Sequence, residues 1–426
     1  MHRVYALPVV MLLAIVPLSA NWPAWRGPTA DGVSRETGLP TTWSATENVA
    51  WKLPLPAYSG STPIIWNDIV FLNVATAKDT GDIELWAVDR NKQAVAWKRP
   101  IAGGNHIERK QNMSSPSPVT DGKHVWVMTG VGMLKAFDFT GKELWMRDIQ
   151  TDYGRFGLNW GYASSPLLHQ GALYVQVLHG MKTDDTPYVM KIDAMSGKTL
   201  WKVDRPTDAL VESPDSYTTP ALLQYDGKTE IVITGGDVVT GHDPATGKEL
   251  WRADVLNPTN NRAYRIVASP VIMNGLIVAP SRNNPMVAIR PGGSGDISTS
   301  HVVWTFNRGP DVPSPVSDGT YVYAVVDTGV VYCLELKTGN LVYGPERLPP
   351  GTYSASPVLA DGKIYVTTEN DGVTTVFKSG PKFEILASNS LDGDCVPYCL
   401  SSVAVSQGQL FLKTSSNLWV IGQRKK

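Results

Sequence analysis

The sequence is poor in charged residues, in cysteine and in long apolar runs. Asp, Glu, Lys and Arg make up 18% of the 426 residues, the formal net charge is −1, and there are three cysteines. Soluble proteins carry about 25% charged residues on average. Long exposed helices depend on such charges, and nucleic-acid-binding proteins present basic runs that this chain lacks. The composition therefore argues against a helical protein and predicts no nucleic-acid partner.

Helical periodicity is also missing. After the N-terminus, no stretch of ten or more residues convincingly repeats apolar residues at i, i+3, i+4 and i+7, whereas short runs of Val, Ile, Tyr and Leu recur between turn residues. The chain has 38 Gly and 31 Pro. Such runs are typical of strands. Because 426 residues exceed the size of one hydrophobic core, we expect either several domains or one repeat architecture, and an all-β fold.

A repeated hexapeptide reveals the repeat. TGKELW occurs at Thr140 to Trp145 and again at Thr246 to Trp251, with the near copy SGKTLW at Ser196 to Trp201. Each longer unit begins with Ser or Thr before Pro and ends in a Thr-Gly-Lys turn and Leu-Trp. The prolines are Pro63, Pro118, Pro166, Pro220, Pro270, Pro315 and Pro357, and Ser402-Val403 keeps the pattern. Units of about 40 to 55 residues with four short strands are typical of β-propeller blades.

The second repeat shows how one blade is built. It predicts strands over residues 117–121, 124–129, 134–138 and 143–147. Proline at the start of the first strand suits the innermost strand, because the free edge of that strand faces a central channel. Large aromatic rings should pack between blades from the fourth strands, namely Trp97, Trp145, Trp201, Trp251 and Trp304, with Tyr343 in the sixth repeat.

The eighth repeat stops after its third strand, Leu418 to Ile421, while Val49 to Leu53 resembles a fourth strand that lacks the other three. We therefore predict an eight-bladed propeller over residues 49–426 whose last blade is closed by the N-terminal strand. Residues 21–48 form an N-terminal extension.

Residues 1–20 have the pattern of a signal peptide. Met1 to Arg3 is weakly basic, Leu7 to Leu18 is apolar but too short to span a bilayer, and Ser19-Ala20 offers a cleavage site. The alternative is an uncleaved anchor, which Pro8 and Pro17 disfavour. We expect a periplasmic or secreted monomer with no transmembrane segment in the mature chain.

The repeat units also carry a family resemblance. Ala136 to Asp138 with Gly141 to Trp145, and His242-Asp243 with Thr246 to Trp251, resemble the tryptophan-docking repeat of pyrroloquinoline quinone (PQQ)-like propellers. That family includes quinoprotein alcohol dehydrogenases and a periplasmic lipoprotein that helps assemble outer-membrane β-barrels. The segment Trp22 to Pro28 is similar to the leader of secreted bacterial members of unassigned activity. The resemblance implies the fold but not a reaction.

Propeller topology predicts where a site would lie. Loops between blades, and turns between second and third strands, share the face opposite the Thr-Gly-Lys turns, and binding groups concentrate on loops held by a rigid frame. Polar and aromatic residues there suit a protein partner or a small polar, anionic or saccharide-like ligand. The alternative for any single residue is ordinary turn capping. The candidates are His106, Arg109, Asn112, Asn159, Trp160, Tyr162, Tyr217, Arg265, Asn283 and Asn370.

No catalytic motif is evident, so the leading interpretation is an exported binding scaffold that acts through its funnel face. The alternative implied by the resemblance is a dehydrogenase that uses PQQ and calcium, with Glu369 as base and Arg282 as cation. The chain has no adjacent cysteines of the kind those enzymes carry, and its histidines do not predict a metal site. Cys395 and Cys399 could form a small disulfide after export.

Overall fold

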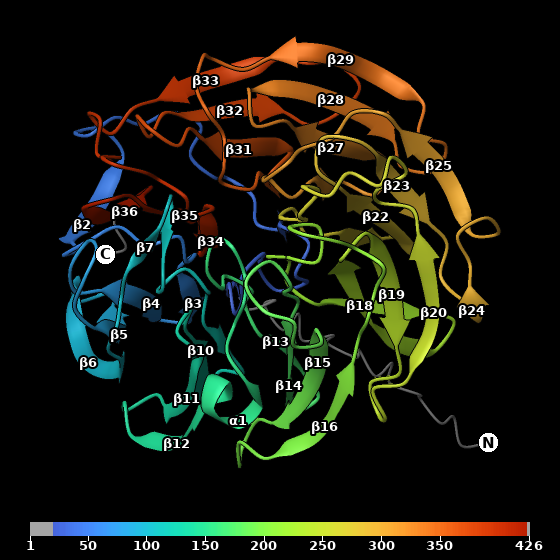
Figure 1. Cartoon of the computed structure of the whole chain (residues 1–426). Helices are drawn as coiled ribbons and strands as arrows, with labels where there is room; N and C mark the ends of the chain where they lie inside the picture. The colour runs from blue at the N-terminus through green and yellow to red at the C-terminus, as the bar shows by residue number, and fades with distance from the viewer. Residues whose placement is uncertain (1–19, 424–426) are drawn as a thin grey trace, which may run out of the picture.

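Eight four-stranded antiparallel blades surround a central axis in a computed structural model that describes residues 20–423 (Figure 1). The predicted all-β, eight-bladed propeller is confirmed. Residues 1–19 of the predicted signal peptide lie outside the described residues. The described chain forms one helix of five residues, α1 (Ile149–Tyr153), capped by Asp148. No helix within residues 20–423 is long and apolar enough to cross a membrane.

The strands of each blade follow one another outward from the axis. Blade 1 contains β3 (Ile64–Trp66), β4 (Ile69–Ala75), β5 (Ile83–Asp89) and β6 (Ala94–Ala102). Blade 2 contains β9 (Val119–Thr120), β10 (His124–Met128), β11 (Met133–Asp138) and β12 (Glu143–Asp148). Blade 3 contains β13 (Leu167–His169), β14 (Ala172–Val177), β15 (Tyr188–Asp193) and β16 (Thr199–Asp204). Blade 4 contains β17 (Ala221–Tyr225), β18 (Lys228–Gly235), β19 (Val238–His242) and β20 (Glu249–Asp254), with β24 (Gly295–Asp296) added in parallel at its outer edge.

The second half of the ring repeats this order. Blade 5 contains β21 (Val271–Met273), β22 (Leu276–Pro280), β23 (Met286–Ile289) and β25 (Val302–Phe306). Blade 6 contains β26 (Val316–Ser317), β27 (Tyr321–Val325), β28 (Val330–Glu335) and β29 (Leu341–Arg347). Blade 7 contains β30 (Val358–Ala360), β31 (Lys363–Thr367), β32 (Thr374–Lys378) and β33 (Ile385–Asn389). Blade 8 contains β34 (Ala404–Ser406), β35 (Gln409–Lys413), β36 (Asn417–Ile421) and β2 (Val49–Pro54).

The ring is closed by β2, as predicted. It pairs antiparallel with β36, placing Trp51 opposite Val420 and Leu53 opposite Leu418. Trp51 is buried in a hydrophobic cluster that joins blades 1, 7 and 8. The first and last parts of the chain therefore share one sheet, and neither blade 1 nor blade 8 is left with an open flank.

The Thr-Gly-Lys turns hold neighbouring blades together. The indole of Trp97 in blade 1 donates a hydrogen bond to the Phe139 carbonyl in the turn of blade 2, at 2.9 Å. A methyl group at Gly141 in the same turn would come within 2.8 Å of that ring, and the φ of Gly141 is +82°. Glycine is needed there for both reasons. Trp145, Trp201 and Trp304 make the same two kinds of contact with the next blade.

Trp251 makes a different hydrogen bond. Its indole donates to the Glu230 carboxylate in its own blade at 2.7 Å, although its ring still packs among apolar residues of blade 5. Blade 5 has no Thr-Gly-Lys turn, because β24 and a longer connection replace it. Without that turn, the glycine and the carbonyl that receive the other rings are missing.

A ring of hydrogen bonds surrounds the axis where the first strands begin. In the first seven blades the residue before the repeated proline donates its backbone N–H to the hydroxyl of the equivalent residue in the next blade. Six of these links measure 2.9 to 3.1 Å, and the Ser165 to Thr219 link measures 3.2 Å. Within residues 20–423 the Thr62 hydroxyl has no hydrogen-bond partner, so the series begins at Thr62 and ends at Ser402. The ring runs through Thr62, Ser117, Ser165, Thr219, Ser269, Ser314, Ser356 and Ser402. These links explain why Ser or Thr occupies this position in all eight repeats, before proline in seven of them and before Val403 in the eighth.

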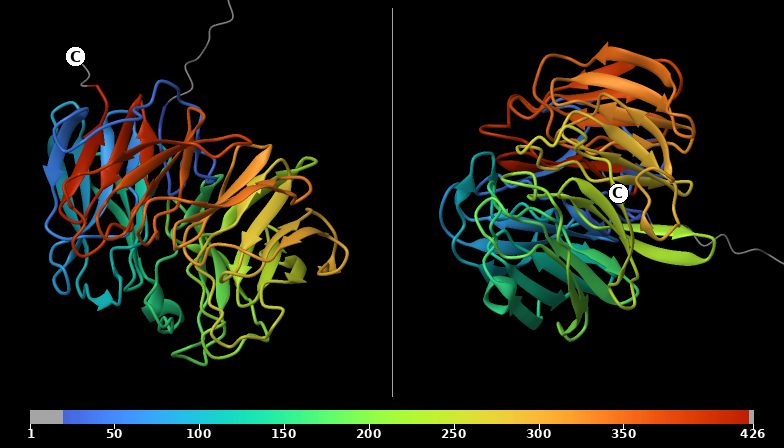
Figure 2. Two further views of the ribbon diagram at one scale, coloured as in Figure 1. Left: turned by 90° about the horizontal axis from the view of Figure 1, so that it is seen from above. Right: turned by 45° about the vertical axis from the view of Figure 1, so that its right-hand side comes forward.

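The extension at residues 21–34 blocks one end of the channel, and we call it the N-terminal plug. Trp22 exchanges two backbone hydrogen bonds with Ile65, and the Pro23 carbonyl accepts from the backbone N–H of Thr120. Across the axis, β1 (Val33–Ser34) pairs in parallel with β30 of blade 7. The plug thus occupies the free edges of inner strands that would otherwise be unpaired. Figure 2 shows the start of the described chain, in blue, and its end, in red, on the face opposite α1.

Arg26 anchors the plug from within. Its guanidinium donates to the carbonyls of Ser314 at 3.4 Å, Pro357 at 3.0 Å and Asp31 at 2.7 Å, and also to that of Pro315. The side chain is 3% exposed, and burial lowers its pKa to about 10. Because this value lies above neutral pH, the group stays charged and satisfies carbonyls from two inner strands.

Lys413 is a buried lysine without a carboxylate partner. Its amino group donates to the Ser61 hydroxyl at 2.5 Å and lies 3.5 Å from the Asn73 carbonyl. Within residues 20–423 it takes part in no ion pair. Burial holds the pKa of Lys413 well below its ordinary value. An isolated buried charge is costly, so the native structure favours the neutral amine.

Replacing Lys413 with Met should stabilise the protein at neutral pH, by about 1 to 4 kcal/mol. Lys413 binds a proton in the unfolded chain but not in the native protein. The free energy of unfolding of the wild type therefore rises with pH until the pH reaches about 10.4, the pKa of lysine in an unfolded chain. The difference in unfolding free energy between K413M and wild type should therefore shrink by up to about 1.4 kcal/mol per pH unit. Denaturant titrations at pH 7, 8 and 9 measure it, and a difference that stays constant over this range contradicts the assignment.

Candidate functional site

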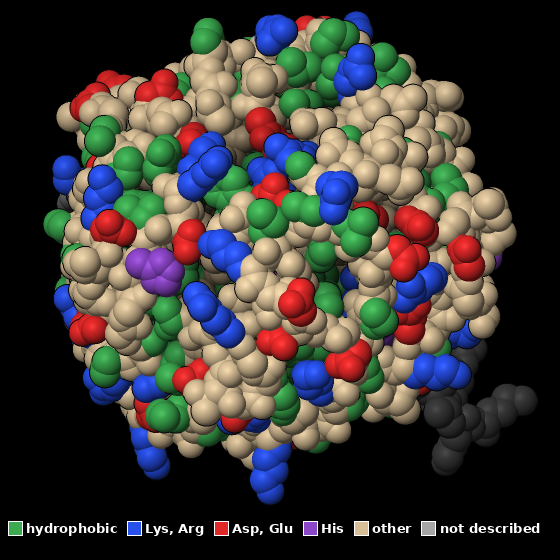
Figure 3. Space-filling view, in the orientation of Figure 1, with side chains coloured by type: hydrophobic (Ala, Val, Ile, Leu, Met, Phe, Trp, Pro, Cys, Tyr) green, Lys and Arg blue, Asp and Glu red, His purple; other side chains and the backbone are tan. Residues whose placement is uncertain are grey.

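The central channel forms a cavity that opens toward the inter-blade loops and has the N-terminal plug at its other end. Its volume is about 380 Å³. Trp25 of the plug lines it, together with hydroxyl residues from the ring around the axis. Figure 3 shows basic and acidic side chains interspersed around the centre of this face. The lining residues nearer the mouth include Glu108, Arg109, Lys110, Gln111, Trp160, Tyr217, Arg265 and Ser354.

A short hairpin extends over the mouth. It consists of β7 (Ile107–Glu108) and β8 (Gln111–Asn112), with Arg109 and Lys110 at the turn. The φ of Arg109 is +59°, a left-handed conformation that hairpin turns of two residues require. The Gln111 amide donates to the backbone carbonyls of Trp160 and Gly161. The hairpin is therefore tied to the next inter-blade loop.

The other end of the hairpin turn reaches across the ring. The Lys110 ammonium lies 3.0 Å from a carboxylate oxygen of Glu369 in blade 7. The Glu369 side chain is 2% exposed, and the same oxygen accepts a hydrogen bond from Ser354. Since this buried carboxylate has a cation and a hydroxyl beside it, the contact fixes the hairpin rather than offering a free acid to solvent.

Trp160 is the central aromatic group of the wall. Its indole N–H donates to Glu212 at 2.6 Å, and its backbone N–H donates to the Tyr217 hydroxyl at 3.0 Å. The guanidinium of Arg109 lies 3.8 Å from the centre of its ring, and that of Arg265 lies 5.4 Å away. Both distances are within the range of cation–π attraction, so the Trp160 ring attracts each of the two guanidinium groups.

Acidic residues balance Arg265 but leave Arg109 unpaired. Arg265 lies 3.7 Å from Glu212 and 3.5 Å from Asp311, and Arg282 also lies 3.5 Å from Asp311. Burial raises the pKa of Asp311, while the two arginines act in the opposite direction. Burial and the nearby Asp311 charge raise the pKa of Asp327 to about 6. Among residues 20–423, Arg109 forms no salt bridge.

The structure brings four of the ten candidate ligand residues to the cavity wall: Arg109, Trp160, Tyr217 and Arg265. The other six do not line it. Asn112 and Asn159 instead hold loops: the Asn112 amide donates to the Tyr58 carbonyl, and that of Asn159 donates to Glu212. Tyr162 is buried in the core between blades 2 and 3. Asn283 and Asn370 are exposed on turns, and exposed His106 lies near Glu108.

Some residues that line the cavity were not predicted from the sequence. Trp25 belongs to a segment with no repeat pattern, so nothing in its spacing indicated that it reaches the axis. Glu108 and Gln111 flank predicted residues but resemble ordinary loop residues. The Ser and Thr residues before the repeated prolines did carry a signal, because eight small hydroxyl residues at one blade position predict a ring around the axis.

The alternative pair, Glu369 and Arg282, is held by other groups of the protein. Neither residue lines the cavity, Glu369 forms an ion pair with Lys110, and the Arg282 guanidinium donates to the Ala263 carbonyl. Within residues 20–423 no group of three His, Cys, Asp or Glu side chains could hold a metal ion. Glu369 and Arg282 therefore present neither a free base nor a free cation to the cavity.

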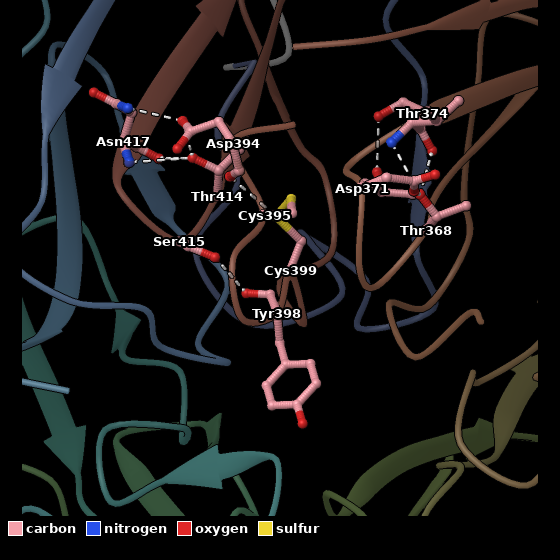
Figure 4. The surroundings of a disulfide bond; sticks show 12 residues. Thr368, Asp371, Thr374, Asp394, Cys395, Tyr398, Cys399, Thr414, Ser415 and Asn417 are labelled. Carbon is pink, nitrogen blue, oxygen red and sulfur yellow. Dashed lines mark hydrogen bonds between the residues drawn. A yellow bond between two sulfur atoms is a disulfide. The ribbon is translucent and has the colours of Figure 1, made fainter. Parts of the chain in front are cut away.

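Cys395 and Cys399 form a disulfide in the loop between blades 7 and 8, with their Cα atoms 5.1 Å apart (Figure 4). Beside it, Asp394 accepts hydrogen bonds from Thr414, Asn417 and the Trp419 indole at 2.6 to 2.7 Å. These hydrogen bonds fix the loop against blade 8. Cys333 is a buried thiol elsewhere in the ring, in β28.

Comparison with known proteins gives one family and several distant relatives. The family described as "Outer membrane protein assembly factor BamB" matches residues 84–343 and 296–380. BamB of Moranella endobia is 25% identical over 304 residues, covering 66% of this chain and 72% of that protein. The quinohemoprotein alcohol dehydrogenase ADH IIB of Pseudomonas putida is 25% identical over 158 residues, which cover 36% of this chain and 21% of the enzyme.

Solved structures share the fold at low identity. BamB from Moraxella catarrhalis superposes with a TM-score of 0.62 and 15% identity, covering 87% of this chain and 98% of that one. A europium-containing methanol dehydrogenase gives a TM-score of 0.68 and 12% identity, with 95% and 98% coverage. At these identities the likeness shows the architecture and leaves the activity open.

Proposed function

The chain belongs to the PQQ-like propeller family described as outer membrane protein assembly factor BamB, and on that premise we propose that it is an exported scaffold that binds a protein partner through its funnel face. Relatives named as assembly factors support a role in protein assembly. We further propose a periplasmic or secreted location and a monomeric scaffold. The support from this chain itself comes from the rim of the funnel.

Exposed apolar side chains at the rim carry the proposal. Leu210 is 58% exposed, Val211 is 44% exposed and Met181 is 41% exposed. The two loops that bear them are joined, because the backbone N–H groups of Gly180 and Met181 both donate to Asp215, at 2.9 and 3.1 Å. We call Met181, Leu210 and Val211 the rim patch. Exposed apolar side chains on two joined loops are a feature of protein-binding surfaces.

The backbone at the patch is strained, which also supports a binding role. Val211 has a φ of +63°, a conformation that β-branched residues rarely adopt. Strain of this kind persists where the surroundings fix it, and it concentrates at functional positions. Here Glu212 fixes the loop: its backbone N–H donates to the Arg262 carbonyl at 3.0 Å, and its side chain accepts from Trp160. A rigid loop loses little entropy on binding.

Site-specific photocrosslinking tests the proposal. We expect a photoreactive amino acid at Leu210, introduced in the cells that make this protein, to crosslink to one discrete protein. The matched control is Leu341 on the outer strand β29, which is 50% exposed but far from the funnel in its blade, and it should give no such product. Changing Val211 to Asp should reduce the Leu210 crosslink about tenfold, since one charge in an apolar contact costs more than 1 kcal/mol. Equal products at Leu210 and Leu341, or none at Leu210, would exclude this surface.

A further inference from the structure

The hydroxyl ring at the axis has unused donors that face a cavity. Six of its members line the cavity: Ser117, Ser165, Thr219, Ser314, Ser356 and Ser402. Each hydroxyl oxygen accepts a backbone N–H from the preceding blade. In the part of the chain that the structure describes, none of these six hydroxyls donates to a protein acceptor. A hydroxyl oxygen can accept while its hydrogen donates, so a ligand in the cavity would meet up to six donors.

Aromatic side chains lie both at the plug end and near the mouth of the same cavity. Trp25 of the N-terminal plug lines it, and Trp160 and Tyr217 line it nearer the mouth. Faces of aromatic rings carry partial negative charge and attract polarised C–H groups as well as cations. Walls that combine aromatic faces with many hydroxyl groups suit a ligand that is apolar on its ring face and polar around its edge. Sugars have this character.

One cation at the mouth has no acidic partner. Lys110 is paired with Glu369, and Arg265 lies between Glu212 and Asp311. Arg109 contacts the Trp160 ring and is otherwise exposed. Arginine binds carboxylates through paired hydrogen bonds. A ligand seated against Trp160 would therefore be bound more tightly if it carried a carboxylate toward Arg109.

From these contacts we infer that the axial cavity binds a small carboxylated sugar of the uronic acid class. The sugar hydroxyls accept from the hydroxyl ring, the carbohydrate ring lies against the aromatic wall, and the carboxylate pairs with Arg109. The volume of about 380 Å³ is at the small end of ligand sites, which suits a monosaccharide or disaccharide. A planar aromatic acid is a poorer fit, because it would leave most of the ring donors without acceptors. The inference goes beyond the proposed protein-binding role at the rim.

Fluorescence titration of the full-length mature protein tests this inference, since two tryptophans line the cavity. The probes are glucuronate, galacturonate, glucose and benzoate at matched ionic strength. We expect saturable binding of at least one uronate, with glucose and benzoate each binding at least tenfold more weakly, consistent with about 1.4 kcal/mol per tenfold. Arg109→Gln should lower the uronate affinity about tenfold and leave glucose binding unchanged. Arg308→Gln, an exposed arginine on the same face that does not line the cavity, should change neither.

A second variant fills the cavity instead of changing charge. Ala163 lines the wall, and Ala163→Phe should abolish binding of every sugar while the far-ultraviolet circular dichroism stays that of the wild type. The inference is overturned if no uronate binds saturably, if benzoate binds as tightly as the uronates, or if Arg109→Gln weakens glucose and uronate equally. Val211→Asp separates the two proposals, because it should reduce the rim crosslink about tenfold and leave uronate binding intact.

Discussion

Replacing Val49 to Leu53 with a Gly-Ser segment of equal length is expected to lower the free energy of unfolding by about 5 kcal/mol or more. Removing the Trp51 side chain from its buried position alone should cost about 3 to 5 kcal/mol. The replacement also removes the side-chain contacts that β2 makes with β36 and with the cluster joining blades 1, 7 and 8. Thermal unfolding followed by circular dichroism and by tryptophan fluorescence measures the effect.

The large effect has a topological cause. When β2 is lost, blade 8 keeps three strands, the apolar strand β36 becomes its outer edge, and water reaches the apolar face that Trp51 covers. We expect the variant to elute as larger species in size-exclusion chromatography, because open edges pair with other chains. Equal length in the replacement keeps the plug connected to the ring.

Lys52→Ala is the matched control for this prediction. Lys52 lies in the same strand, but it is exposed, and its ammonium lies 4.7 Å from the centre of the Trp419 ring. Its loss should cost about 0.5 to 1 kcal/mol. A Gly-Ser variant that melts at the wild-type temperature would show that ring closure contributes little to stability. If Lys52→Ala lowered the stability as much as the Gly-Ser replacement, the loss would not come from the buried contacts of β2.

Arg26→Met should be the most destabilising single substitution in the N-terminal plug, at about 3 to 5 kcal/mol. The side chain would still fill its space, but four buried carbonyls would lose their donor: those of Asp31, Ser314, Pro315 and Pro357. Each unpaired buried acceptor costs about 1 to 3 kcal/mol before the structure relaxes. Chemical denaturation measures this loss.

Arg35→Met provides the comparison. Arg35 follows β1 in the same extension and is exposed, so its substitution should stay within about 0.5 kcal/mol of wild type. Local release of the plug, rather than global unfolding, would appear as faster hydrogen exchange at Trp22 and Val33 with an unchanged melting temperature. If the Arg26→Met protein were as stable as Arg35→Met and its hydrogen-exchange rates at Trp22 and Val33 matched the wild type, Arg26 would not anchor the plug.

Local sequence carried most of the information about the blades. The proline positions, the Thr-Gly-Lys turns and the fourth-strand tryptophans depend on hydrogen bonds and packing that recur in each repeat, so their pattern repeats as well. The observed strands of blade 2 differ from the predicted ranges by at most two residues at an end. Trp251 shows the limit of this reasoning. Its hydrogen-bond partner depends on the neighbouring blade, which there lacks the expected turn.

The candidate site could be predicted only in part. Trp160 and Arg265 stood out because large aromatic and cationic residues on inter-blade loops face the funnel. Asn112 and Asn159 have the same sequence character, but their side chains are used up in loop hydrogen bonds. Glu369 is a further case: its pairing with Lys110 joins residues 259 positions apart, and no local pattern indicates it.

The sequence by itself determined the number of blades, the position of their strands and the strand that closes the ring, because each of these follows from periodicity and from local turn chemistry. The tertiary structure decided three other features. These are the plug at one end of the channel, the ring hydroxyls that donate to no protein acceptor within residues 20–423, and the cavity-lining Arg109, which forms no salt bridge in that range. Each depends on which distant groups satisfy one another's hydrogen bonds and charges, and such pairing is settled only when the ring is closed.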